Sequence, residues 1–387
     1  MAVNKIHPDA EVGFDLPALP GMAIGDVQTP CLIIDLDRFE YNLQRMAHIL
    51  EPYKVSLRPH AKMHKSIDVA RRQMDYGQAE GICCQKVSEA EVFARAGFTD
   101  ILITNQVCDP LKIVRLARMA AMGCRVSVCV DDKKNVSALS VEAKKQDIQL
   151  HCLVELDCGA NRCGVTEPEQ LTELAVVINA SENLNFDGIQ AYQGNIQHEP
   201  NYKKRKQELD AAIVQVKACI ESLAKIGIEC NIVTGGGTGT FLLEAASGLY
   251  TEIQCGSYAF MDVDYGRIFN ENGKRLDQGE WKNALFILTS VMSTARSGHA
   301  VCDAGLKVQS VDSGLPVIFD RDDVTYITCS DEHGIIEDKL NKLSINDKLR
   351  LVPGHCDPTC NLHDWYVCVR DGQVESLWDI SARGKAW

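Results

Sequence analysis

The chain has 387 residues, 45% of them hydrophobic and 24% charged, which is typical of a globular protein with an ample core. Its net charge of −13 argues against a nucleic-acid or anionic-membrane partner, and we find no apolar stretch of transmembrane length and no signal-peptide core. Seventeen cysteines without a secretory signal indicate free thiols in a reducing compartment, so we expect a cytoplasmic protein.

The first predicted elements are a strand followed directly by a helix. The segment Thr29-Pro-Cys-Leu-Ile-Ile-Asp-Leu36 is apolar and β-branched, as strands are. Asp37, with Glu40 three residues later, has the pattern of a capping box. We therefore expect a helix that begins at Asp37 and continues through Leu50.

From about residue 53 to about residue 260, short apolar runs alternate with segments of helical period. The runs are 53–57, 81–84, 101–104, 125–130, 150–156, 186–191, 230–233 and 252–255. The clearest helical segments, with apolar residues three and four apart, are 88–96, 111–122, 169–179 and 202–225. Eight strands that alternate with helices predict a (β/α)8 TIM barrel. A doubly wound open sheet is the alternative, because periodicity does not show closure.

After about residue 275 the pattern changes to short runs separated by turns, which predicts an all-β region. The runs are 284–292, 300–303, 324–329, 348–352 and 365–370. We therefore predict two domains. Residues 36–275 would form the barrel, and residues 1–35 would join residues 276–387 in a β domain.

A lysine flanked by two histidines follows the first strand of the predicted barrel. In Arg58-Pro-His60-Ala-Lys62-Met-His64-Lys, the proline disfavours helix at Arg58, so Lys62 should follow a strand end. A lysine can form a Schiff base with a carbonyl cofactor, and the imidazoles of His60 and His64 can move protons near neutral pH. Taken alone, the segment fits a basic surface turn better.

Two glycine-rich loops follow the last two predicted strands. They are Thr234-Gly-Gly-Gly237-Thr238-Gly and Cys255-Gly256-Ser257-Tyr258. Glycines let backbone N–H groups approach an anion, and these loops form a frequent phosphate site in barrels. A phosphate on one side and an amine-reactive carbonyl on the other describe pyridoxal phosphate.

Further polar residues follow other strands of the predicted barrel. Gln85 follows the second strand, Arg162 lies beyond the fifth and Tyr192 ends the sixth. Tyr192 can pack on the cofactor ring or hold its phosphate, and Arg162 can face the pyridine nitrogen. Core packing of the tyrosine and a surface ion pair of the arginine explain these two residues equally well.

A second constellation lies in the β region, in Pro353-Gly-His355-Cys356-Asp357-Pro-Thr-Cys360. If the backbone is extended there, His355 and Asp357 point to one face and can bind one metal ion. An imidazole and a carboxylate with open positions favour Mg²⁺ or Mn²⁺. A zinc site that uses Cys356 and Cys360 is the rival interpretation, and a hydrogen-bonded turn without metal is the simplest one.

These motifs resemble the fold-type III pyridoxal-phosphate enzymes of the D-threonine aldolase and D-serine dehydratase group, over nearly the whole chain from Thr29. Within that group the chain is most similar to the aldolases that act on 3-hydroxy-D-aspartate. Gly81-Ile-Cys-Cys-Gln-Lys-Val-Ser-Glu-Ala-Glu and Asp262-Val-Asp-Tyr-Gly-Arg extend this similarity. The resemblance implies an alanine-racemase-type barrel with a β domain, and a homodimer whose active site lies between the barrel and the partner's β domain.

The resemblance also implies residue roles. Lys62 would be the Schiff-base lysine, and His355 with Asp357 would hold the metal. The cofactor would be surrounded by Gln85, Tyr192, Gly237, Thr238, Gly256, Ser257 and Tyr265. The dehydratases of the group carry a cysteine two residues after the histidine and use zinc. Asp357 occupies that position here and favours the aldolases.

We therefore expect an aldolase, dependent on pyridoxal phosphate and a divalent metal, that cleaves a D-configured β-hydroxy amino acid. The expected reaction converts 3-hydroxy-D-aspartate to glycine and glyoxylate, or D-threonine to glycine and acetaldehyde. His60, His64 and a metal-bound hydroxide are candidates for the general base. The metal, Arg58 or a nearby lysine can bind the second carboxylate of the substrate. A dehydratase that releases a keto acid and ammonia is the main alternative; a racemase and a non-catalytic cofactor-binding protein are two others.

Overall fold

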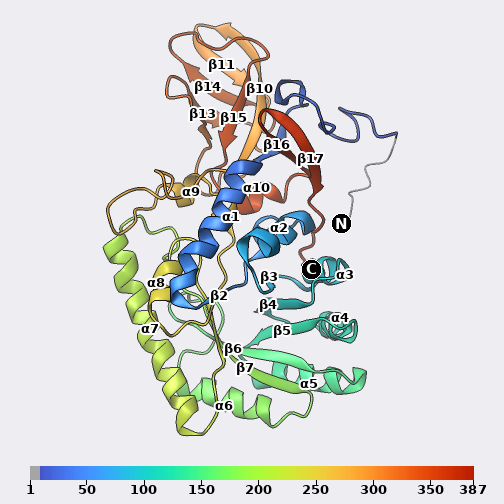
Figure 1. Ribbon diagram of the computed structural model, residues 1–387, viewed down its shortest axis with the longest axis vertical. Helices are drawn as coiled ribbons and strands as arrows, with labels where there is room; N and C mark the ends of the chain where they lie inside the picture. Colours follow the sequence, from blue (N-terminus) through green and yellow to red (C-terminus); the bar gives the residue numbers. More distant parts are fainter. Residues whose placement is uncertain (1–8) are drawn as a thin grey trace.

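The computed structural model describes residues 9–387 and places a barrel of parallel strands beside a second, largely antiparallel sheet (Figure 1). The eight strands of the barrel pair in the order β2-β9-β8-β7-β6-β5-β4-β3, and all seven of these pairings are parallel. Their bounds are β2 Ser56–Leu57, β3 Ile82–Cys84, β4 Asp100–Gln106, β5 Arg125–Val130, β6 Leu150–Leu156, β7 Leu184–Ala191, β8 Ile232–Gly235 and β9 Glu252–Ile253.

The ring closes between β2 and β3. The Glu80 N–H donates to the Leu57 carbonyl and the Cys83 N–H donates to the Pro59 carbonyl, both at 3.0 Å, and a parallel bridge joins His60 to Cys83. These hydrogen bonds join the two ends of the eight-strand path. The (β/α)8 prediction is therefore confirmed, and the open doubly wound sheet is excluded.

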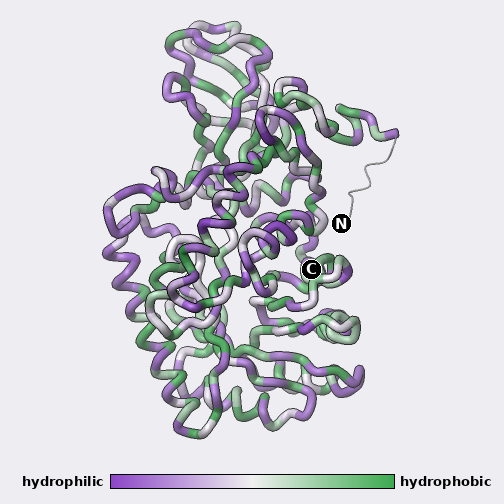
Figure 2. Tube along the Cα trace, in the orientation of Figure 1, coloured by the Kyte–Doolittle hydropathy of each residue, from purple (hydrophilic) through white to green (hydrophobic). Residues whose placement is uncertain are grey.

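Helices follow the strands on the outside of the barrel. Their bounds are α1 Leu36–Leu50, α2 Ile67–Gly77, α3 Val87–Arg95, α4 Pro110–Ala121, α5 Lys133–Gln146, α6 Pro168–Asn179, α7 Tyr202–Lys225 and α8 Phe241–Ala246. Helix α7 alternates between hydrophilic and hydrophobic segments along its length (Figure 2). Its buried positions 209, 212, 216, 219 and 223 are three and four residues apart, so one face packs on the barrel.

Helix α1 begins earlier than the capping-box pattern predicts. Its N-cap is Asp35, whose carboxylate accepts the Arg38 N–H at 3.1 Å. The carboxylates of Asp37 and Glu40 bind the guanidinium of Arg370, on strand β16 (Trp365–Arg370), instead of capping the helix. The predicted start at Asp37 was wrong because a tertiary ion pair occupies both carboxylates.

The second sheet contains the first strand of the chain. Its strands are β1 Cys31–Asp35, β10 Leu285–Arg296, β11 Gly298–Cys302, β12 Val317–Ile318, β13 Thr325–Cys329, β14 Gly334–Asp338, β15 Lys348–Val352, β16 Trp365–Arg370 and β17 Gln373–Asp379. Strand β1 pairs antiparallel with β10 and parallel with β16. The sequence patterns missed β12, β14 and β17. The division of the chain at residues 35 and 275 stays a prediction, and its residues 1–8 lie outside the described part.

Reduced cysteines fill part of the barrel interior. Cys83 and Cys129 pack with Leu102 and Leu153 from the neighbouring strands, and all four side chains are buried. Burial raises the thiol pKa of both cysteines well above its ordinary value, so they stay protonated and pack as small apolar groups. Among residues 9–387, no helix combines the length and the apolar composition that crossing a bilayer requires.

Candidate active site

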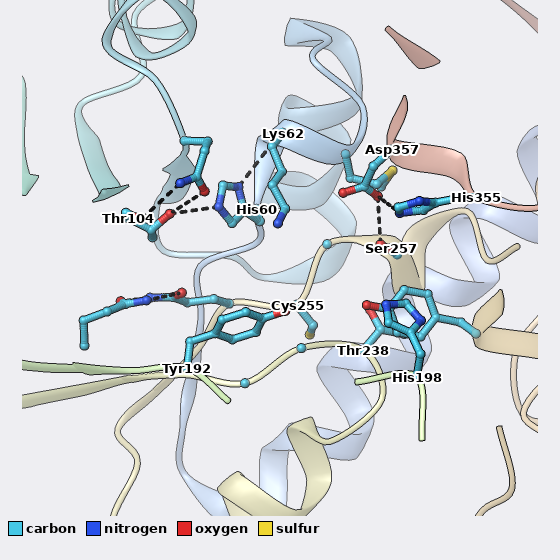
Figure 3. A pocket seen from close by; sticks show the side chains of 18 of the residues that line it. His60, Lys62, Thr104, Tyr192, His198, Thr238, Cys255, Ser257, His355 and Asp357 are labelled. Carbon is cyan, nitrogen blue, oxygen red and sulfur yellow. Dashed lines mark hydrogen bonds and ion pairs between the residues drawn. The ribbon is translucent and has the colours of Figure 1, made fainter. Parts of the chain in front are cut away.

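A cavity of about 170 Å³ opens at the carboxyl ends of the barrel strands, next to the short helix α10 (Cys356–Cys360) of the second sheet. Lys62 lies in the 3-10 turn Ala61–Met63, just beyond β2. Its side chain points into the space between His60 on one side and Asp357 with His355 on the other (Figure 3). The barrel and the β-rich part of the chain therefore both contribute walls to this cavity.

The loops after the other strands bring most of the remaining candidates to the same cavity. The predicted residues that line it are His60, Lys62, Gln85, Arg162, Tyr192, Gly237, Thr238, Gly256, Ser257, Tyr265, His355 and Asp357. Their convergence follows from the topology, because the carboxyl ends of all eight parallel strands meet at one end of a barrel.

The two histidines beside Lys62 differ in position. His60 lines the cavity; its Nε2 lies 2.9 Å from Thr104 Oγ1, and its Nδ1 accepts the Lys62 N–H at 3.3 Å. Burial, assisted by the positive charge of Lys62, holds the pKa of His60 well below its ordinary value. His60 is therefore a neutral imidazole whose Nε2 proton is shared with Thr104.

His64 does not line the cavity. It is fully buried, its Nδ1 accepts the Ser66 N–H at 3.0 Å, and its ring packs edge-on against Phe93. Burial lowers the pKa of His64 to about 3. A neutral imidazole that faces the core cannot exchange protons with a substrate in the cavity, so His64 is not carried into the proposed mechanism.

The two glycine loops form a tight cradle. A Cβ atom on Gly237 would lie 2.3 Å from Gln197 Oε1, and one on Gly256 would lie 2.7 Å from the His60 carbonyl oxygen. Thr238 Oγ1 accepts the Tyr258 N–H at 3.0 Å, which joins the loop after β8 to the loop after β9. The approach to the His60 backbone at Gly256 requires glycine, and the backbone N–H groups of the two loops along the cavity suit the phosphate of pyridoxal phosphate.

Arg162 and Tyr192 lie together at the cavity wall. The guanidinium carbon of Arg162 is 5.8 Å from the Tyr192 ring centroid, and its Nη2 lies 3.7 Å from Glu155 Oε1. The arginine side chain is half exposed, whereas burial raises the pKa of the Tyr192 hydroxyl. The structure thus contains both the surface ion pair and the cavity placement that were alternatives for Arg162.

The prediction of a metal pair assumed an extended backbone from His355 to Asp357. The backbone is not extended over the whole of this segment. His355 is the N-cap of α10 and has extended dihedrals, but Asp357 is in the first helical turn. The two side chains still converge, with His355 Nε2 3.9 Å from Asp357 Oδ1. The Asp262 carboxylate fixes this arrangement, because it accepts the N–H groups of both Cys356 and Tyr265 at 2.9 Å.

The His355 and Asp357 pair suits a divalent cation. His355 Nδ1 lies 2.9 Å from Asp312 Oδ2, which is the usual second partner of a metal-binding histidine and leaves Nε2 free for the ion. Although burial opposes it, the negative charges of Asp357 and Asp312 raise the pKa of His355, as expected where a cation is favoured. No group of three or more His, Cys, Asp or Glu side chains surrounds a common point within residues 9–387, so an ion here would keep open positions.

The rival zinc site has poor ligands. Cys356 and Cys360 are fully buried, and burial raises the pKa of each thiol above its ordinary value. Thiolates are the form that binds zinc. Carboxylate and imidazole groups are therefore the better donors at this end of the cavity.

A histidine that sequence reasoning missed also lines the cavity. His198 Nδ1 lies 2.8 Å from Asp264 Oδ2, and its ring is 4.6 Å from the Tyr265 ring and 6.3 Å from the His355 ring, between centroids. Asp264 and Tyr265 belong to helix α9 (Val263–Gly266). His198 lies in the segment between β7 and α7, and no motif surrounds it, so only its position past the end of a barrel strand could have drawn attention to it.

Arg58 does not face the cavity. Its Nε donates to Glu252 Oε2 and its Nη1 to Asp100 Oδ1, both at 2.7 Å, and its side chain is 6% exposed. Arg58 precedes Lys62 in the chain but belongs to a buried ion-pair network inside the barrel. It is therefore no candidate for binding a substrate carboxylate.

Comparisons with known proteins agree with this site and fold. Residues 34–264 match the family model of the alanine racemase N-terminal domain, and residues 284–369 match that of the putative serine dehydratase domain. The chain therefore belongs to the alanine racemase-like, fold-type III class of pyridoxal-phosphate enzymes, whose barrel and antiparallel sheet it shares.

Within this class the chain falls among the aldolases. It is 58% identical to a 3-hydroxy-D-aspartate aldolase of Paracoccus denitrificans, over 97% of both chains. It is 44% identical to a D-threonine aldolase of Arthrobacter, over 95% of this chain and 96% of the relative. The crystal structure of D-threonine aldolase from Filomicrobium marinum superposes with a TM-score of 0.92, at 43% identity, over 96% of this chain and all of that one. The protein is a member of this aldolase family of lyases.

Proposed function

We propose that the protein cleaves 3-hydroxy-D-aspartate to glycine and glyoxylate, with pyridoxal phosphate at Lys62 and a divalent metal at His355 and Asp357. The observation that carries this proposal is that Lys62, the glycine cradle and the His355/Asp357 pair line one cavity. D-Threonine, which would give glycine and acetaldehyde, is the second candidate substrate.

The residues present fit both groups. Lys62 would hold the cofactor through its carbonyl carbon, with the phosphate at Gly237, Thr238, Gly256 and Ser257. Bound pyridoxal phosphate supplies an electron-withdrawing ring that stabilises negative charge at Cα after bond cleavage, and a bound Mg²⁺ or Mn²⁺ supplies positive charge at the substrate hydroxyl. The remaining steps fall to side chains of this chain.

His198 is the best-placed base for the hydroxyl proton. Its Nδ1 lies 2.8 Å from Asp264 Oδ2, and a neutral ring with its proton on Nδ1 would present Nε2 as the acceptor. Its ring faces His355 from across the cavity. Removal of that proton by His198 would start the cleavage of the Cα–Cβ bond, and the released aldehyde would be glyoxylate.

His60 would act as a hydrogen-bond donor that stays in place, and not as the base that removes a proton from the substrate. Its Nε2–H donates to Thr104 Oγ1, and Thr104 Oγ1 also lies 3.3 Å from Gln85 Oε1. This chain of hydrogen bonds holds the His60 ring in place beside Lys62, and burial keeps the ring neutral. Ser257 Oγ donates to Asp357 Oδ1 at 3.2 Å and so connects the cradle with the proposed metal ligand.

The second carboxylate of 3-hydroxy-D-aspartate requires a cation. Lys62 and Arg162 are the lysine and arginine side chains that line the cavity within the described residues. Lys62 is committed to the cofactor, so Arg162 and the metal remain to bind this carboxylate. The half-exposed position of Arg162 at the wall supports such a role, in addition to contact with the cofactor ring.

The decisive experiment is a substrate panel with product analysis. The enzyme would be incubated with 3-hydroxy-D-aspartate and with D-threonine, with added Mn²⁺ or Mg²⁺ and with EDTA. Glycine and an aldehyde, formed only when metal is added, are the expected products. Ammonia with a keto acid would instead establish the dehydratase, and glycine formation unaffected by EDTA would remove the metal from the proposal. Lys62→Ala should be inactive with either substrate.

Two further properties belong to the proposal. We propose a homodimer, as the resemblance to this enzyme group implies, which light scattering on the full chain would test.

We also propose a cytoplasmic location, which the seventeen free thiols support because most of them are buried and reduced thiols persist in a reducing compartment.

A further inference from the structure

A second cavity, of about 210 Å³, lies on the other side of the loop that follows β8. Thr238 lines both cavities, so they share a wall. The apolar part of the second cavity comes from α1, α8 and the segment that leads into β10: it includes Ile49, Phe241, Leu276 and Trp281. None of these four residues lines the candidate active site.

Two guanidinium groups line this second cavity. Arg205 is 2% exposed, and carbonyl oxygens rather than carboxylates accept its hydrogen bonds: Glu199 O at 2.6 Å and Phe269 O at 2.7 Å. Its Nε is buried without a hydrogen-bond partner in the described part of the chain, and so is the Nε of Arg45. The guanidinium of Arg45 lies 5.7 Å from the ring centroid of Trp281.

A buried cation without a counter-ion is costly, because the low-polarity surroundings do not replace water. Burial lowers the pKa of Arg205, although the negative charges of Glu199 and Glu244 partly oppose this effect without a direct ion pair. The acids that line the cavity are Glu271, which is exposed, and Glu280, which is half-buried and accepts a hydrogen bond from Asn270. The cavity therefore combines a buried guanidinium group with one exposed and one half-buried carboxylate, which favours a ligand with a single negative charge.

We propose that this cavity binds a small monocarboxylate with an apolar, ring-sized body. Its carboxylate would accept hydrogen bonds from Arg45 and Arg205, and its body would pack against Trp281 and Phe241. Both arginines line this cavity, and guanidinium groups are the usual partners of carboxylates. The aromatic rings of Trp281 and Phe241, 6.0 Å apart between centroids, supply a flat apolar wall.

The site can be tested by fluorescence titration of the full chain loaded with pyridoxal phosphate. The probe is 3-phenylpropionate, and 3-phenylpropanamide is its uncharged control. We expect saturable binding of the carboxylate, seen as a change in tryptophan emission that Trp281→Phe reduces. The amide should bind at least tenfold more weakly, because it lacks the charge that Arg45 and Arg205 recognise.

Single-residue variants test whether 3-phenylpropionate binds in this cavity. Arg45→Gln should weaken binding of 3-phenylpropionate at least tenfold, measured by calorimetry, while the control Arg118→Gln, which changes an exposed arginine on α4, should leave it unchanged. Asp357→Asn should also leave it unchanged, because Asp357 lines only the other cavity. Equal binding of acid and amide, no saturation up to about 10 mM, an undiminished affinity in Arg45→Gln, or a loss in Asp357→Asn would each overturn the proposal.

Discussion

Asp312 Oδ2 lies 2.9 Å from His355 Nδ1, on the side of the imidazole away from Asp357. A carboxylate in this position fixes the ring and its tautomer, so that Nε2 presents a lone pair towards the cavity. Asp312 lies 43 residues before His355 in the chain and in a different loop, so this relationship emerges only in the folded protein.

The first prediction concerns this pair. Asp312→Asn should raise the Mn²⁺ concentration needed for half-maximal aldolase activity about 10- to 100-fold, because the imidazole loses the partner that orients it. Activity at saturating Mn²⁺ should largely recover. Asp322→Asn, at an exposed aspartate in the same part of the chain, is the matched control and should behave as wild type. An unchanged metal requirement in Asp312→Asn would show that His355 binds no metal.

The second prediction tests His198. His198→Gln should lower kcat about 10²- to 10⁴-fold, which is the usual contribution of a general base. The affinity for pyridoxal phosphate should fall much less than kcat, because His198 belongs neither to the glycine cradle nor to the Lys62 segment. Asp264→Asn should give a smaller loss of kcat, since it removes only the partner that orients the ring. A fully active His198→Gln variant would return the role of base to another group.

The third prediction concerns the glycine cradle. Gly256→Ala should weaken binding of pyridoxal phosphate, measured by absorbance titration, because the new Cβ would lie 2.7 Å from the His60 carbonyl oxygen and displace the loop. Gly25→Ala is the control, since a Cβ at Gly25 meets nothing within 4 Å. Equal cofactor affinity in the two variants would contradict the assignment of the phosphate site.

The fourth prediction separates stability from substrate binding at Arg58. Arg58→Met leaves the buried Glu252 without its counter-ion, while Asp100 keeps Arg125, so the free energy of unfolding should fall by about 3–5 kcal/mol. KM for 3-hydroxy-D-aspartate should not change in the protein that remains folded. Arg162→Met should do the opposite, with little loss of stability and a higher KM. Urea denaturation and steady-state kinetics on both variants would show the contrast.

The fifth prediction is a pH dependence of stability. Burial raises the pKa of Glu244 to about 7, although Thr240 Oγ1 donates to its Oε1 at 2.6 Å. The unfolded chain loses this proton near pH 4.5 and the folded protein only near pH 7, so stability should fall as the pH rises between these values. The loss is roughly 3 kcal/mol, at about 1.4 kcal/mol per pKa unit.

Glu244→Gln removes this titration and keeps the oxygen that accepts from Thr240. The difference in unfolding temperature between the variant and the wild type should therefore shift in favour of the variant from pH 5 to pH 8, measured by calorimetry on the apoenzyme. Glu208→Gln, at an exposed glutamate of α7, should show no such shift. Parallel pH profiles for wild type and Glu244→Gln would contradict the raised pKa.

The strands that the sequence predicts best have apolar or β-branched residues at most of their positions. The bounds Arg125–Val130, Leu150–Leu156, Lys348–Val352 and Trp365–Arg370 agree with the structure at both ends. Strands β14 and β17 were missed because their apolar runs are short, Ile335-Ile336 in β14 and Leu377-Trp378 in β17, and their pairing comes from hairpin neighbours. Closure of the barrel could not be predicted from periodicity either, since it depends on the backbone hydrogen bonds that the carbonyls of Leu57 and Pro59 accept, at and just after the end of β2.

The sequence predicted those parts of the site that lie in an unusual local sequence pattern. A lysine between two histidines and two glycine loops at strand ends drew attention without any coordinates. His198 and Asp312 did not, because each acts through a partner from another segment, and single polar residues in loops are common. Arg58 and His64 were candidates only because they are close to Lys62 in sequence; both are buried, and neither lines the cavity.

The position of β1 between β10 and β16 has a consequence for the order of events during synthesis. Both neighbours of this strand lie more than 240 residues further along the chain, so β1 has no partner while the ribosome makes the barrel. At about 5–20 residues per second this interval lasts tens of seconds. An apolar strand, Cys-Leu-Ile-Ile-Asp, is unpaired throughout that time, tethered to a nearly finished barrel. Nascent chains stalled before residue 285 should therefore be the species most dependent on chaperones.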